Sequence, residues 1–70
     1  MMATGTVIWF NPHKQFGFIG PDDGDKDVFV HQMDVTEAGL ETLQEGQRLE
    51  FTRAEYEGRI KATELKLAEA

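Results

Sequence analysis

The 70-residue sequence has no cysteine, only seven lysines and arginines, and no long apolar run. Without cysteine it can form neither a disulfide framework nor a zinc site built on thiolates, and we predict that it holds no metal and no cofactor. No apolar run approaches the roughly 20 residues that cross a bilayer, and residues 1–6 lack the basic and apolar regions of a signal peptide. We therefore expect a soluble, cytoplasmic protein that does not bind membranes.

The excess of acidic residues counts against nucleic-acid binding. Thirteen aspartates and glutamates give a formal net charge of -6 and a pI near 4.7, whereas nucleic-acid-binding domains are usually basic. Because exposed charges separated by more than about 8–10 Å are largely screened, the placement of charge matters more than its sum. Most of the acid falls in residues 22–27 and 37–57, which we expect to lie away from the aromatic residues. We predict that the excess of acidic residues lowers the affinity for nucleic acid.

One face of residues 14–19 is predicted to carry two aromatic rings. Phe16 and Phe18 are two positions apart, so an extended strand places both rings on the same side. Gly17 between them and Lys14 ahead of them are expected to leave that side flat, open and positively charged. Rings exposed in this way favour a flat partner, and the bases of single-stranded nucleic acid are the leading candidate.

Residues 28–31 repeat the pattern, because Phe29 and His31 also share one side of a strand. The intervening residues 21–25 are rich in proline, aspartate and glycine, which is typical of a turn between antiparallel strands. Pairing of the two strands would gather all four rings into one patch.

Five short strands are predicted within a single small domain. Each is rich in β-branched and aromatic residues or alternates apolar with polar positions. They cover residues 5–11, 13–20, 26–31, 47–54 and 59 onward. Because a flat sheet of five strands would leave free edges, we predict an all-β fold in which five antiparallel strands close into a barrel.

Two of these strands have an irregular alternation. In the first, Val7 and Trp9 have one parity and Ile8 and Phe10 the other, yet all four are apolar. Either the strand is buried on both sides or a bulge swaps the parity. In the last segment the alternation of apolar positions changes phase within residues 63–70. This change favours a bulged strand, and a short C-terminal helix is the alternative.

Residues 32–46 contain few strand-forming residues and are predicted to be a long loop with one helical turn. Residues 34–37 have the form of a capping box, and Gly39 is expected to end the turn soon after. Three apolar side chains are expected to anchor this loop to the core: Val35, Leu40 and Leu43.

The two aromatic segments resemble the two RNA-binding motifs of the bacterial cold-shock proteins, which are single-domain members of the cold-shock domain family. Residues 14–19 are similar to the family's first motif, Lys-Gly-Phe-Gly-Phe-Ile, and residues 28–31 match the second. Three further segments are similar, namely residues 9–11, 21–24 and 43–47. The resemblance covers nearly the whole chain.

This resemblance implies one cold-shock domain over residues 1–70, with an all-β, five-stranded antiparallel OB-fold barrel. It implies binding of single-stranded RNA and DNA by aromatic base stacking with low sequence specificity. The family role is that of an RNA chaperone and regulator of transcription and translation in the stress response to cold. No enzymatic activity is implied. A monomer is expected, and a dimer formed by strand exchange is left open.

The residues expected to bind nucleic acid are Trp9, Phe10, Lys14, Phe16, Phe18, Phe29, His31, Gln32 and Arg59. His31 is also compatible with a structural hydrogen bond at the end of its strand. Lys61 is a weaker candidate for a phosphate contact. Tyr56, in an acidic turn, is interpreted as a surface residue or a lid over the barrel end.

Four positions depart from the family pattern. Ile8 stands where the family usually has a lysine, and Gln15 replaces the first glycine of the first motif. Gln32 and Leu40 stand where aromatic residues are common. Because a base stacked on an aromatic ring contributes about 1–3 kcal/mol, two missing rings predict weaker binding or a narrower choice of sequence.

Parts of the sequence also suggest three other functions. An acidic OB-type barrel with weakened nucleic-acid binding would suit a protein-interaction module. The alternating aspartates of residues 23–27 suggest a calcium loop, but the required glycine at its sixth place is Val28. His13, Lys14 and His31 offer acid–base groups for RNA cleavage, yet no deep substrate pocket is predicted. The calcium and cleavage hypotheses are therefore disfavoured.

Overall fold

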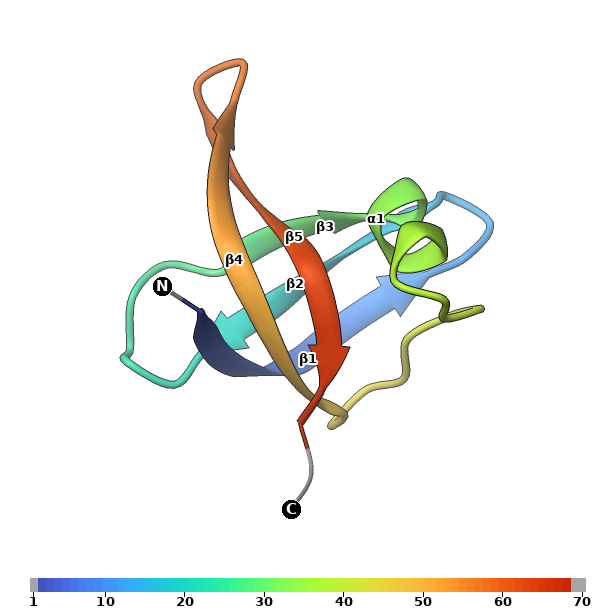
Figure 1. Ribbon diagram of the computed structural model, residues 1–70, viewed down its shortest axis with the longest axis horizontal. Helices are drawn as coiled ribbons and strands as arrows, with labels where there is room; N and C mark the ends of the chain where they lie inside the picture. The colour runs from blue at the N-terminus through green and yellow to red at the C-terminus, as the bar shows by residue number, and fades with distance from the viewer. Residues whose placement is uncertain (1, 69–70) are drawn as a thin grey trace.

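The computed structural model describes residues 2–68, which form five strands and a short helix (Figure 1). In chain order these are β1 (Ala3–Asn11), β2 (Phe16–Pro21), β3 (Val28–His31), α1 (Gln32–Glu37), β4 (Arg48–Tyr56) and β5 (Arg59–Leu67). All five predicted strands are present. β2 and β3 begin two or more residues later than predicted, because residues 12–15 form a turn and residues 25–27 are irregular. Within residues 2–68 no helix combines the length and hydrophobicity that a membrane span requires.

The sheet closes on itself in the order β1-β2-β3-β5-β4, since β4 also pairs with β1. The predicted all-β, five-stranded fold is confirmed. The prediction of a purely antiparallel sheet is wrong, because β3 and β5 run parallel where Phe29 pairs with Lys61. A closed ring with an odd number of strands cannot alternate direction throughout, so one neighbouring pair has to be parallel.

The pairing of β1 and of β5 each contains a register shift, which explains why apolar and polar positions do not alternate regularly in these two segments. The pairing of β1 with β2 shifts register between Val7 and Trp9, so Val7 is buried while Ile8 is 47% exposed. In β5 the register shifts opposite Glu50 and Thr52, and Glu64 adopts a φ of 52°. The final segment is therefore a bulged strand rather than a helix, while residues 69–70 of the predicted tail lie outside the described residues.

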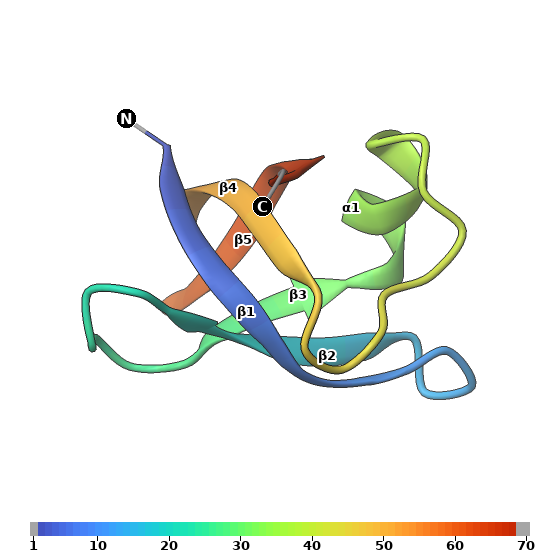
Figure 2. The same cartoon turned by 90° about the horizontal axis from the view of Figure 1, so that it is seen from below.

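The interior of the barrel is apolar and receives side chains from every strand. Its buried members are Val7, Ile19, Val28, Val30, Val35, Leu43, Leu49, Phe51, Ala62 and Leu65. Val35 and Leu43 are in the core and Leu40 packs against it, so the predicted anchoring of the long loop is confirmed. Figure 2 shows α1 and the following loop at one end of the barrel, beside the end of β3.

The helix starts earlier than the capping box predicted. His31 is its N-cap, and His31 Nδ1 accepts a hydrogen bond of 3.0 Å from the Met33 N–H. Asp34 lies within the helix and is buried. Its carboxylate accepts hydrogen bonds from Lys61 Nζ at 3.2 Å and Thr63 Oγ1 at 3.1 Å. A buried carboxylate is costly without such partners, so this contact fixes α1 against β5.

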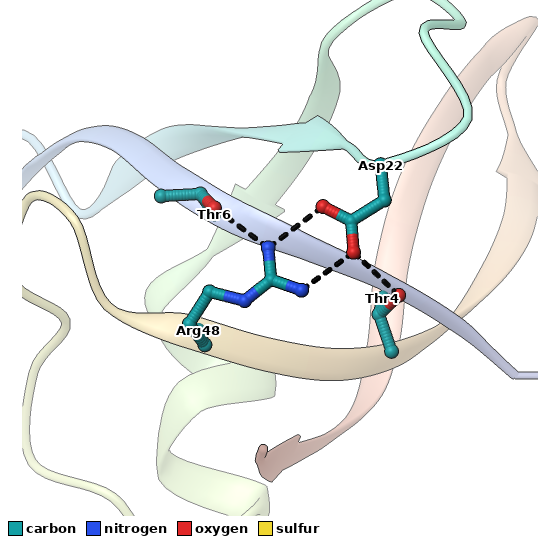
Figure 3. Close-up of polar contacts among 4 residues, drawn as sticks. All are labelled: Thr4, Thr6, Asp22 and Arg48. Carbon is teal, nitrogen blue, oxygen red and sulfur yellow. Dashed lines mark hydrogen bonds and ion pairs between the residues drawn. The ribbon is translucent and has the colours of Figure 1, made fainter. Parts of the chain in front are cut away.

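A polar network on the outside of the barrel spans three neighbouring segments (Figure 3). Arg48 donates two hydrogen bonds to the Asp22 carboxylate, at 2.7 and 2.5 Å, and one to Thr6 Oγ1 at 2.9 Å. Thr4 Oγ1 donates to the same carboxylate at 2.8 Å. The hydrogen bond from Arg48 is the main cause that lowers the pKa of Asp22 from 3.8 to about 2. The network ties the turn after β2 to the start of β4 across β1.

This network predicts a pH dependence of stability. Because the pKa of Asp22 is lower in the folded protein than in the unfolded chain, its contribution is present above about pH 4 and lost as the pH falls toward 2. We expect Asp22→Asn to lower the urea midpoint at neutral pH and to flatten its fall between these pH values. Asp27→Asn, the same change in the same turn but outside the network, should leave the wild-type profile. Identical profiles for the two variants would contradict the assignment.

Candidate nucleic-acid interface

Five rings lie side by side on the outer face of β1, β2 and β3. The strand registers place Trp9 opposite Phe18, Phe18 opposite Phe29, and Phe16 opposite His31. The ring centroids of Trp9 and Phe16 are 5.3 Å apart, those of Phe16 and Phe29 are 5.6 Å apart, and those of Phe18 and Phe29 are 6.0 Å apart. Phe29 and His31 are separated by 6.4 Å. We call these five side chains the ring patch.

The ring patch and the core occupy opposite faces of the same strands. Ile19, Val28 and Val30 are almost completely buried, while the neighbouring rings of the patch are only half-buried. The predicted division of the two faces is confirmed. A second apolar surface therefore faces solvent, and it holds its rings edge to face and stacked on one another, the arrangements that aromatic pairs prefer.

Gly17 has a different role from the one predicted. It does not flatten the ring patch, because its position faces inward and is buried. A Cβ there would collide with the carbonyl oxygen of Trp9 and lie 2.7 Å from Phe10 Cα. Gly17 thus allows β1 to approach β2 closely beneath the rings. Phe10 packs against the core cluster, so the structure does not bring this predicted binding residue into the ring patch.

The side chain of Gln32 also forms hydrogen bonds within the protein. Its Nε2 donates to Thr36 Oγ1 and to the carbonyl oxygen of Glu41, both at 3.2 Å. These bonds hold the loop after α1, and Gln32 does not extend the row of rings. Gln15, which replaces the first glycine of the first motif, lies exposed with a φ of 67°, a left-handed conformation that glycine adopts more easily.

Of the two cations predicted to contact phosphates, Arg59 lies against a ring of the patch, and Lys14 lies in the turn that precedes Phe16. Lys14 is exposed in the turn between β1 and β2, where its backbone N–H donates to Asn11 Oδ1 at 3.2 Å. The Arg59 guanidinium carbon lies 5.1 Å from the centroid of the Phe29 ring. The two cations therefore belong to different parts of the fold, the β1–β2 turn and the start of β5.

The rings of Phe16, Phe18 and Phe29 also form the floor of an open hollow of about 860 Å³. Its charged rim consists of Asp25, Lys26, Asp27, Arg53 and Arg59. Sequence reasoning missed Lys26 and Arg53, because an isolated cation gives no signal until the fold places it beside the rings. It also expected the acidic turn to lie away from the aromatic face, and the positions of Asp25 and Asp27 show that this was wrong in part.

Part of the acid is neutralised by ion pairs within the protein. Asp22 pairs with Arg48, and Arg53 lies 2.9 Å from Asp23. The backbone N–H of Asp25 and then Arg53 lower the pKa of Asp23. No group of three or more potential metal-ligating side chains occurs among residues 2–68. The ring patch and the neighbouring Arg59 offer flat surfaces for stacking and a cation for an ionic contact.

Comparisons with known proteins point to one family. The model of the "Cold-shock" DNA-binding domain matches residues 3–68. A probable cold shock protein of Sinorhizobium fredii is 61% identical over 51 residues, which cover 73% of this chain and 74% of the relative. A cold shock-like protein, CspE, of Escherichia coli is 60% identical over 47 residues (67% and 68%). A cold shock-like protein of Rickettsia bellii is 49% identical over 63 residues, or 90% of each chain.

The close approach of β1 to β2 at Gly17, beneath the ring patch, can be tested by substitution. Gly17→Ala should lower the free energy of unfolding by about 1–3 kcal/mol, because backbone atoms of β1 cannot move aside cheaply. Gly20→Ala is the matched control in the same strand. Its Cβ would meet the flexible Ile8 Cδ1 at 3.0 Å, so the loss should be clearly smaller. Urea unfolding followed by Trp9 fluorescence measures both, and equal losses would contradict this assignment.

Proposed function

The chain belongs to the cold-shock domain family, and we propose that it binds single-stranded RNA and DNA by stacking unpaired bases on the ring patch. The observation that carries this proposal is the placement of Trp9, Phe16, Phe18, Phe29 and His31 on one solvent-facing surface of three adjacent strands. Every base has a flat face that can stack on such rings, so low sequence specificity is expected. In a duplex those faces are already covered by neighbouring bases.

The proposed roles of individual residues follow from their positions. Trp9, Phe16, Phe18 and Phe29 stack on bases. His31 adds a fifth ring, whose Nε2 is the nitrogen not used in capping α1. Lys14 and Arg59 contact phosphates at the two sides of the patch. Two further residues that the sequence predicts to bind do not touch the nucleic-acid strand in this proposal. Phe10 supports the surface from the core side, and Gln32 supports it from the first turn of α1.

Binding of this kind suits an RNA chaperone. A protein that covers unpaired bases without reading them opposes intramolecular pairing and leaves the strand accessible to transcription and translation. We infer that residues 1–70 act as one OB-type domain, as a monomer and without enzymatic activity, in the cytoplasm where transcripts are found. The acidic side chains beside the hollow should lower the affinity, because they repel phosphates.

A second candidate is an acidic protein-interaction module. The observation in its favour is that Asp25 and Asp27 lie at the rim of an apolar hollow, where they would repel phosphates and attract a basic peptide. The two functions differ in their response to loss of these two acids. An Asp25→Asn/Asp27→Asn variant should bind nucleic acid more tightly, whereas an interaction module should bind a basic peptide more weakly.

The proposed function predicts quenching of Trp9 fluorescence when a short, unstructured oligothymidylate or oligouridylate is added. The affinity should fall as salt rises, because phosphate contacts release counterions. Phe18→Ala should weaken binding by roughly 5- to 150-fold, the equivalent of about 1–3 kcal/mol for one stacked base. Leu67→Ala, which removes an exposed apolar side chain at the far end of β5, is the matched control. Absence of quenching at low salt with the wild-type protein folded would reject the function.

A further inference from the structure

A smaller hollow of about 220 Å³ adjoins the ring patch on the side of the β4–β5 hairpin. Its walls are Phe29, Tyr56, Glu57, Arg59 and Lys61. The hairpin projects beyond the body of the barrel (Figure 1). Glu57 and Gly58 at its tip both have positive φ, 51° and 76°, as in the two-residue turns that match the twist of paired strands. This tight turn sets Tyr56 directly opposite Arg59.

The hollow is continuous with the ring patch because its side chains share the same outer face. Phe29 pairs with Lys61 across the parallel β3–β5 contact. Arg59 is two residues before Lys61, and Tyr56 is the cross-strand partner of Arg59. Ala62, of the opposite parity, is completely buried. A strand lying across the rings can therefore reach the hairpin without crossing an edge of the barrel.

Rings and cations alternate in this hollow. The Arg59 guanidinium carbon is 5.1 Å from the centroid of Phe29, and Lys61 Nζ is 5.3 Å from the centroid of Tyr56. Lys61 Nζ also lies 3.2 Å from Asp34 Oδ2, which holds it in place. Tyr56 is 61% exposed, so a flat partner can reach its side chain from solvent. Asp34 balances Lys61 and Glu57 also lines the hollow, so the capacity to bind an anion rests mainly on Arg59, with Lys61 as a second hydrogen-bond donor.

We propose that this hollow is a subsite for one further unpaired nucleotide of the strand that occupies the ring patch. Its base stacks on Tyr56, and its phosphate lies against Arg59 and Lys61. Arg59 offers a planar fork of donors that matches phosphate geometry, and Lys61 adds a point charge. The inference rests on the proposed function and extends it to a side chain that the sequence marks only as a surface residue. It requires a ligand that is both flat and anionic, which a nucleotide is.

The test is a series of oligothymidylates of about four to ten nucleotides, titrated against wild type and Tyr56→Ala with Trp9 fluorescence as the readout. Short strands, held by the rings of β1–β3, should bind both proteins almost equally. The longest strand should bind Tyr56→Ala roughly tenfold more weakly, because it loses one stacked base. Tyr56→Phe keeps the ring and should follow the wild-type curve at every length.

Leu67→Ala, another loss of an exposed apolar side chain from the same hairpin, should also follow the wild-type curve. Circular dichroism verifies that every variant is folded. The subsite is rejected if Tyr56→Ala matches wild type at every length, and equally if it loses the same factor at every length. Failure of the proposed function would give a different result, because the Trp9 fluorescence of the wild-type protein would then respond to no oligothymidylate. That result would reject the subsite as well.

Discussion

The alternation of side chains along a β-strand is the constraint on which both the core and the ring patch depend. β2 and β3 send Ile19 and Val28 into the barrel and Phe18 and Phe29 out of it. Closure of the sheet protects only the inner row. The outer row stays in contact with solvent, so the barrel is stabilised by one apolar face while the other remains available for a ligand. The same short hairpin therefore serves folding and, in our proposal, binding.

The placement of the rings could be predicted from the sequence because it depends on a period of two that is visible over a few residues. The location of a bulge could not. Four consecutive apolar residues revealed a parity conflict in β1, but only the pairing of β1 with β2 places the register shift between Val7 and Trp9. The parallel contact of Phe29 with Lys61 was missed for a related reason. It is a property of the closed ring of five strands and of no single segment.

Charge was the least predictable feature, since it depends on contacts between distant segments. Asp34 looked like the first residue of a capping box, yet it is buried against Lys61, 27 residues away. Asp25 and Asp27 were expected to lie away from the rings and instead line the hollow beside them. A net charge of -6 therefore gives little information about the local field at the ring patch. What matters there is which acids are paired within the protein and which cations, such as Arg59, remain beside the rings.

The most direct test of the account is a titration with a short oligothymidylate, followed in aromatic proton–carbon NMR spectra. The rings of Phe16, Phe18 and Phe29 should shift as the strand is added, because stacked bases change the magnetic environment of the rings that they cover. Phe51, completely buried in the core, is an internal control whose signals should stay in place. Unmoved signals from the three outer rings, at a strand concentration that binds the protein, would contradict base stacking on the ring patch.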